Sequence, residues 1–148
     1  MLRALNLSDS TITARVVAIQ HAAYRIEADL MGFDGIPPLH ESVLDLPLHD
    51  LDWTGTWDDG VLVGFIARRE TPSECEIDRL AVHPAFHRRG HGRALVRTVL
   101  HHDRVSVSTG TKNVPALKLY ESLGFRRVGL REIAPGVTVT ELRRMLST

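Results

Sequence analysis

The chain has 148 residues, and its 18 basic and 18 acidic side chains give a formal net charge of zero, so no overall field favours nucleic acid or a membrane as a partner. This length fits a single domain, residues 1–148, with a buried hydrophobic core. The single cysteine excludes an internal disulfide bond, and no apolar segment reaches signal-peptide or membrane-spanning length, so we expect a cytoplasmic protein.

The first half of the chain predicts two helices followed by two strands. Ser8–Ser10 can cap the first helix, Gly32 ends it, and an Asp-Asp-Gly turn at 58–60 joins the strands as a hairpin. The apolar stripe expected on the first helix comprises Ile12, Val16, Ile19, Ala23, Ile26 and Leu30. In chain order, the predicted segments are a short strand at 2–5, a helix at 8–30, a turn or extended link at 35–39, a short helix at 40–46, and strands at 53–57 and 62–69.

The second half alternates strands with helices. Its predicted segments are a strand at 74–82, a helix at 92–102, a short strand from Val105, a helix that begins after Asn113, and strands at 126–131 and 137–143. A β-α-β-α-β centre of this kind indicates an α/β fold with a mixed sheet and helices packed on its faces.

The segment between the strand at 74–82 and the next helix is the most informative. Gly90 and Gly92 allow a sharp turn and a close approach of the backbone to a ligand, and Arg88 and Arg89 add positive charge. A basic turn at the start of a helix suits a polyanion such as a pyrophosphate. No Gly-Lys-Ser/Thr follows, and Leu95 replaces the third glycine of a dinucleotide fingerprint. An ordinary strand–turn–helix connection with solvated arginines remains the alternative.

A second informative segment runs from Val105 to Phe125. Asn113 is a good N-cap, Pro115 falls in the first helical turn, and Gly124 is a typical helix C-cap. The apolar face expected on this helix comprises Ala116, Leu119, Tyr120 and Leu123.

Together the two segments resemble the GNAT N-acetyltransferase superfamily. Residues His87 to Gly92 are similar to its motif A, Gln/Arg-x-x-Gly-x-Gly/Ala, with histidine at the Gln/Arg position, and Asn113 to Phe125 match its segment Asn-x-x-Ala-x-x-Leu-Tyr-x-x-x-Gly-Phe. The resemblance implies the GNAT-like acyl-CoA N-acyltransferase fold and an enzyme that uses acetyl-CoA as co-substrate. It also implies direct transfer of the acetyl group to a primary amine of a small molecule. A peptide or protein N-terminus as acceptor, and a non-catalytic acyl-CoA-binding sensor, remain alternatives.

The resemblance also implies which residues contact acetyl-CoA. The strand end at Leu80–Val82 would pair its backbone with the pantetheine arm, the turn would hold the pyrophosphate, and Asn113 would add a contact unless it only caps its helix. The implied cofactor-binding residues are Leu80, Ala81, Val82, His87, Arg88, Arg89, Gly90, His91, Gly92, Arg93, Ala94 and Asn113.

Acetyl transfer to an amine needs a base for the amine and a proton donor for the leaving thiolate. Glu74, Glu76 and Asp78 alternate with apolar residues and Arg79, so they share one strand face, and Glu76 or Asp78 is the expected base. Their alternative role is a solvated or arginine-paired face. Tyr120 is the expected acid by resemblance, with a packed core aromatic as the alternative.

The resemblance places one wall of the acceptor pocket on the segment that joins the two N-terminal helices, with Phe33, Asp34 and Glu41 as candidate contacts. These two acids, with Glu27 and Asp29 just upstream, predict a cationic acceptor. His83, His87 and His91 have helical spacing, but Pro84 and Gly90 interrupt them, so we expect no metal. The sequence leaves a homodimer open.

Overall fold

The structure is a computed structural model that describes residues 1–146, so the last two residues of the predicted domain lie outside the described part. Seven strands hydrogen-bond into one sheet with the order β1-β2-β3-β4-β5-β7-β6. The elements are β1 (Leu2–Ala4), α1 (Ser10–Met31), α2 (Pro37–His40), β2 (Asp52–Asp58), β3 (Val61–Glu70), β4 (Glu74–Val82), α3 (His91–Arg97), β5 (Arg104–Gly110), α4 (Val114–Ser122), β6 (Arg126–Ala134) and β7 (Val137–Met145). The β4–β5 pair is parallel and the other pairs are antiparallel, so the predicted mixed α/β fold is confirmed.

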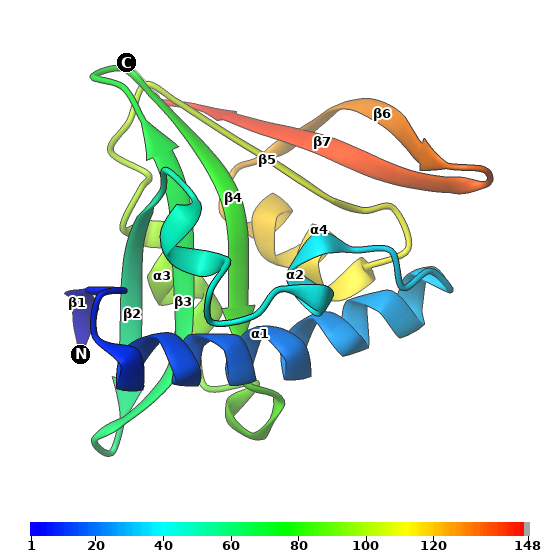
Figure 1. The fold of residues 1–148 in the computed structure, drawn as a ribbon. Coiled ribbons are helices and arrows are strands. Elements are labelled where there is room, and N and C mark those ends of the chain that lie inside the picture. The colour runs from blue at the N-terminus through cyan, green and yellow to red at the C-terminus, as the bar shows by residue number, and fades with distance from the viewer. Residues whose placement is uncertain (147–148) are drawn as a thin grey trace.

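The helices form one layer on each side of the sheet, with α1 and α2 in front and α3 and α4 behind in Figure 1. The front core packs Val16 and Ile19 of α1 against Phe65 of β3. The rear core packs α3 and α4 against the apolar residues of β4, β5 and β7. The three longer helices and the central strands are therefore held in place by burial of an apolar face, whereas β1 and β6 have no fully buried residue.

The ends of α1 follow the sequence, but its buried stripe does not. Asp9 caps the helix by accepting from the backbone N–H of Thr11, and Gly32 ends it at a φ of +63°. Ile26 and Leu30 of the predicted stripe are instead 39% and 41% exposed. The stripe fails in the second half of the helix because polar side chains share the buried face; the buried residues of α1 are Thr13, Val16, Ile19, Gln20, Tyr24, Ala28 and Met31.

Two further helix predictions were wrong. The short helix expected at 40–46 begins instead at Pro37 and ends at His40, because prolines are favoured in a first helical turn, where their missing N–H has no partner to lose. The helix expected at 92–102 ends at Arg97. Its chain then continues in tighter turns, in which Val99 N–H donates to the carbonyl of Val96 and Thr98 Oγ1 donates to Leu95.

A β-bulge and a strand separation shape β4. Ala67 pairs with Arg79 but Arg68 pairs with Ile77, so Asp78 is the extra, bulged residue. The parallel pairing of β4 with β5 ends at Ile77 and Val107, and the two strands then separate towards α1 (Figure 1). The end of β4 therefore has one free backbone edge.

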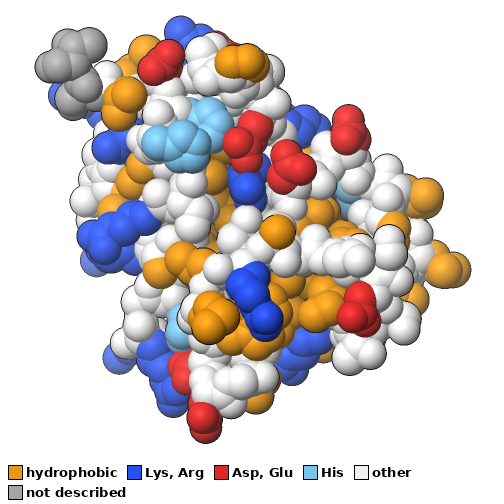
Figure 2. All heavy atoms as spheres, turned by 90° about the vertical axis from the view of Figure 1, so that its left-hand side faces the viewer, with side chains coloured by type: hydrophobic (Ala, Val, Ile, Leu, Met, Phe, Trp, Pro, Cys, Tyr) orange, Lys and Arg blue, Asp and Glu red, His pale blue; other side chains and the backbone are white. Residues whose placement is uncertain are grey.

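The surface mixes charges of both signs. Figure 2, which looks onto the β1 side of the molecule, shows basic and acidic side chains scattered among apolar ones. Among residues 1–146, no helix is long and apolar enough to cross a membrane.

Candidate active site

A cavity of about 310 Å³ opens where β4 and β5 separate. Its lining includes Asp78 and Leu80 of β4, Ser108 of β5, Asn113 and Tyr120 at α4, and Tyr24 and Glu27 of α1. A second cavity of about 220 Å³ follows Leu80–Val82 to His87. The two cavities share Tyr24, Glu27, Leu80 and Asn113, so they form a path from His87, at the start of the glycine turn, to Tyr120.

The second cavity explains the apolar residues that α1 leaves exposed. Ala23, Ile26 and Leu30 line it on the side opposite the free edge of β4. A channel with an apolar wall and a backbone edge suits a flexible arm that carries amides, because the edge offers hydrogen bonds and the wall excludes water. Two side chains already contact this edge: Tyr24 donates to the carbonyl of Leu80 at 3.4 Å, and His87 Nε2 lies 2.9 Å from the carbonyl of Val82.

Tyr120 is part of the hydrophobic core and also lines the larger cavity. Its ring is buried against Phe125, with 5.3 Å between centroids, and it lines the larger cavity. Burial raises the pKa of the Tyr120 phenol well above its ordinary value, and the nearby Glu27 carboxylate raises it further. The phenol therefore keeps its proton at neutral pH and can donate it.

Glu27 lines both cavities, although the sequence indicated it only as one of the acids near the expected acceptor wall. Its carboxylate accepts from the backbone N–H of Gly110 at 3.3 Å and from Thr109 Oγ1 at 3.4 Å, which ties α1 to the end of β5. A spacing signal was present: Gln20, Tyr24, Glu27 and Met31 follow one helical face. A search for apolar residues at helical spacing does not find this face, because Gln20, Tyr24 and Glu27 are polar.

The two candidate bases have different surroundings. Asp78 lines the cavity with Tyr120 and is held by Arg69 at 3.2 Å and by Arg79 Nε at 2.6 Å. Glu76 also contacts Arg69 at 3.2 Å, but its side chain is 61% exposed and lines an adjoining hollow of about 400 Å³, which shares Asp78, Val107 and Ser108 with the larger cavity. That hollow lies over β4, β5 and β7 and also contains Arg143. The structure therefore brings Asp78, and not Glu76, into one cavity with Tyr120.

Arg79 forms a buried polar cluster behind the site. Its guanidinium contacts Asp78, Glu41 and the side-chain oxygen of Gln20. Burial alone lowers the pKa of Arg79, but the hydrogen bonds to Asp78 and Glu41 outweigh burial and raise it. The cluster fixes the bulge of β4 and thereby the position of the Asp78 carboxylate.

The expected acceptor residues lie apart from the cavity. Glu41 binds Arg79 in the buried cluster, whereas Phe33 and Asp34 line a shallow hollow beside Arg25. The same segment does contribute Ile36–Pro38 to the cavity wall. The wall is therefore apolar where it meets the cavity, and the charge-based expectation of a cationic acceptor gains no support from Asp34 or Glu41.

The glycine turn has the conformation that its sequence predicts. Gly90 precedes α3 with a φ of +82°, and Arg88 also has a positive φ of +64°. A Cβ on Gly92 would lie in ordinary contact with Leu119, at 3.4 Å, which shows that the start of α3 lies against α4. Arg93 donates to Ser122 at 2.9 Å across the same contact. The backbone of the turn is therefore held open and close to α4.

Asp58 of β2 neutralises part of the charge in this turn. Arg89 lies 3.1 Å and His91 2.9 Å from its carboxylate. The hydrogen bonds from His91 and then Arg89 lower the pKa of Asp58. Arg88 is exposed and has no ion pair with any residue from 1 to 146, so it is the free cation of the turn.

Comparison with known proteins agrees with this geometry. Residues 20–125 match the acetyltransferase (GNAT) family. The N-alpha-acetyltransferase RimI of Mycobacterium tuberculosis is 38% identical over 129 residues, which are 82% of this chain and 81% of that protein. The UPF0157 protein YqkA of Bacillus subtilis is 34% identical over 144 residues, and the chain spans only 42% of its length.

The fold also matches a solved structure. The ribosomal-protein-S18-alanine N-acetyltransferase of Escherichia coli superposes with a TM-score of 0.78, covering 100% of this chain and 94% of that one at 18% identity. At that identity the similarity concerns the fold alone.

Proposed function

The chain belongs to the GNAT family of acetyltransferases, and from this premise we propose that it transfers an acetyl group from acetyl-CoA directly to a primary amine of a small molecule. The observation that carries the proposal is the cavity at the β4–β5 separation, where Tyr120 and Asp78 meet at the end of a channel that begins near the glycine turn. A cytoplasmic location, where acetyl-CoA is available, belongs to the same proposal.

The channel would hold acetyl-CoA in an extended form. The free edge of Leu80–Val82 offers backbone groups to the pantetheine amides, while Ala23, Ile26 and Leu30 cover the apolar side. The turn at Arg88–Gly92 would bind the pyrophosphate through backbone N–H groups and the free charge of Arg88. In this arrangement the thioester reaches the cavity beside Tyr120.

In the reaction, the amine nitrogen attacks the thioester carbonyl carbon, a C–N bond forms and the C–S bond breaks. A base must take a proton from the amine, because an ammonium group has no lone pair. Asp78 is the favoured base by its place in the cavity, and Glu76 would act through water from the adjoining hollow. Tyr120 would then donate its proton to the departing thiolate.

A peptide N-terminus is the second candidate acceptor. The relative with 38% identity is an N-alpha-acetyltransferase by name, and the hollow beside Glu76 extends the cavity region along β5 and β7. Both acceptors present a primary amine, so the same chemistry serves either. A homodimer, the absence of nucleic-acid and membrane partners, and an acetyl transfer that uses no metal stay predictions.

A thiol-release assay tests the proposal. Purified protein with acetyl-CoA is offered small amines, polyamines, amino acids, aminoglycosides and short peptides, and mass spectrometry identifies the acetylated product. Amine-dependent CoA release with a small molecule supports the proposal, and release with peptides alone supports the second candidate. Tight acetyl-CoA binding without turnover on any acceptor would instead indicate a sensor.

A further inference from the structure

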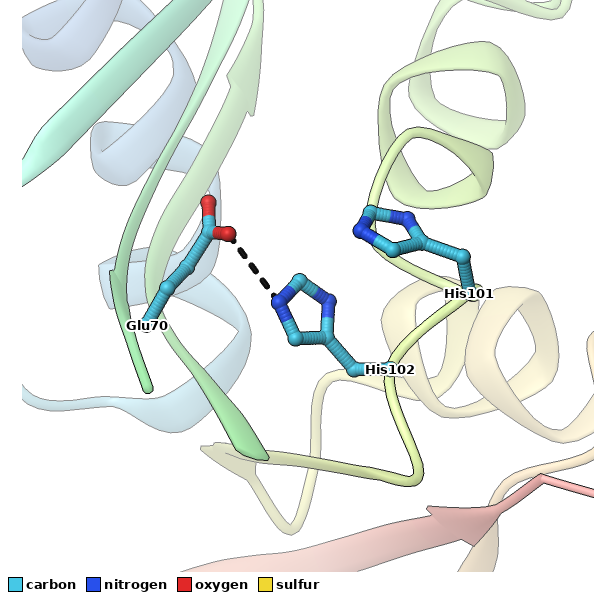
Figure 3. Close-up of side chains that lie close together, drawn as sticks. All are labelled: Glu70, His101 and His102. Carbon is cyan, nitrogen blue, oxygen red and sulfur yellow. Dashed lines mark ion pairs between the residues drawn. The ribbon is translucent and has the colours of Figure 1, made fainter. Parts of the chain in front are cut away.

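Three potential metal ligands from distant parts of the chain meet at the end of the sheet opposite to the free edge of β4. Glu70 ends β3, and His101 and His102 follow α3; one ligand atom from each lies within 4.8 Å of the others (Figure 3). His102 Nε2 is 3.0 Å from Glu70 Oε2, and the two imidazole rings are 4.2 Å apart. Spacing along the sequence does not indicate this cluster, because Glu70 is remote from both histidines.

Two of the three side chains are oriented by other groups. His102 is buried, and its Nδ1 lies 3.0 Å from the carbonyl oxygen of Val99, so Nδ1 carries hydrogen and Nε2 points to Glu70. Arg68 holds Oε1 of Glu70, which leaves Oε2 directed at the ring. A backbone carbonyl behind a histidine and a hydrogen bond on a carboxylate are the usual outer partners of metal ligands.

We propose that Glu70, His101 and His102 bind one divalent transition-metal ion of the zinc class. The ligands are Oε2 of Glu70, Nε2 of His102 and one ring nitrogen of His101, with water completing a tetrahedron. Two imidazoles and one carboxylate suit zinc, nickel or cobalt better than magnesium or calcium.

The distances fit this ion. Zinc bonds of roughly 2.0–2.1 Å at tetrahedral angles place two ligand atoms about 3.3 Å apart. The 3.0 Å between Glu70 and His102 is already close to that value, so only the exposed ring of His101 must move to close the site. Glu70 and His101 are exposed, so an ion can enter the cluster from solvent.

The position of the cluster predicts a structural effect. Glu70 pairs with Cys75 near the start of β4, whereas the channel lies along the end of β4, at Leu80–Val82. A bound ion would join the end of β3 to the segment that follows α3. We therefore expect metal binding to raise thermal stability and to leave acetyl transfer unchanged, so the outcome does not depend on the proposed enzyme activity.

The experiment uses untagged, chelator-treated protein with zinc chloride as the probe and cobalt chloride as its spectroscopic substitute. Calorimetry should give one zinc ion per chain, cobalt should give a visible absorption band of a tetrahedral site, and zinc at 100-fold above its Kd should raise the melting temperature by roughly 5–10 °C. His101→Ala removes an exposed ligand, and Glu70→Gln keeps the size of the side chain and its contact with Arg68.

Each variant should weaken zinc binding at least tenfold, while His21→Ala, an exposed histidine on α1, should not. The proposal is overturned if wild-type protein binds no zinc, or if the Kd and melting shift of His101→Ala and Glu70→Gln equal those of wild type. Equal weakening by His21→Ala would also overturn it, because that result indicates scattered surface binding.

Discussion

At the scale of single residues, removing the hydroxyl of Tyr120 distinguishes a structural role of the side chain from a catalytic one. Tyr120→Phe keeps the ring against Phe125 but removes the proton donor, so kcat should fall tenfold to a thousandfold while the Kd for acetyl-CoA stays within twofold. Steady-state kinetics with calorimetric binding measures both. Unchanged kcat with a lower melting temperature would show that the hydroxyl is structural and that another group donates the proton.

Asp78 and Glu76 share Arg69 but only Asp78 reaches the cavity, so their amide variants form a matched pair. Asp78→Asn should lower kcat/KM at least tenfold, most strongly at low pH, where free amine is scarcest. Glu76→Gln should have an effect below threefold. Because Asp78 also contacts Arg79, a denaturant titration must accompany the kinetics to show that Asp78→Asn still folds. A larger loss of kcat/KM in Glu76→Gln than in Asp78→Asn would show that Glu76 is the base.

Residue chemistry was only partly predictable from the sequence. Tyr120 and Asp78 occupy one cavity because α4 and the bulge of β4 bring them there, and alternation along a strand cannot show a bulge. Glu27 was expected only as an acid near the acceptor wall, because its helical face contains Gln20 and Tyr24, which a count of apolar residues ignores. Glu41 was expected at the acceptor, but a long-range contact with Arg79 places it in a buried cluster.

At the scale of elements, the turn before α3 is the critical connection. The space around a Cβ at Gly90 is open, and its φ of +82° strains any side chain. Gly90→Ala and Gly90→Asp therefore share the strain but differ in charge. We expect Gly90→Asp to weaken acetyl-CoA binding at least tenfold more than Gly90→Ala, because the carboxylate lies where the pyrophosphate would bind.

Calorimetry with both variants measures this difference, and melting temperatures check that both fold equally well. If the two variants bind acetyl-CoA alike, the turn does not hold the pyrophosphate. Arg88 and Arg89 provide a further contrast within the same turn, since Asp58 already neutralises Arg89 but not Arg88.

Element positions were predictable where local chemistry defines them. The N-cap Asp9, the C-terminal Gly32 and the Asn113 cap all act within a few residues, and the structure confirms each of them. The second helix and the end of α3 depend on tertiary packing and on 3-10 turns, which a periodic pattern does not specify. The predicted order of strands and helices nevertheless agrees with the observed order, because these errors concern only where single helices begin and end.

At the scale of the whole molecule, Cys75 reports on folding. It is buried in the rear core between β4, α3 and β5, and burial raises the pKa of its thiol to about 12. At pH 8 the thiol of the folded protein therefore stays protonated and shielded from solvent, so a thiol reagent should label the protein only as fast as it unfolds. Labelling rates in increasing urea should follow the unfolding measured by circular dichroism.

The same burial sets a pH dependence. The thiol has an ordinary pKa of 9.0 and a higher one in the folded protein, so its contribution to stability is complete below pH 9 and is lost as the pH rises towards 12. Cys75→Ala should remove that part of the alkaline loss. Rapid labelling of folded protein at pH 8 would contradict the buried position.

The burial of Cys75 also affects how the proposed activity can be measured. Because the chain has one cysteine and that cysteine is buried, the folded enzyme should not react with the thiol reagent of a thiol-release assay. The assay then counts only the CoA product, without a background from the enzyme.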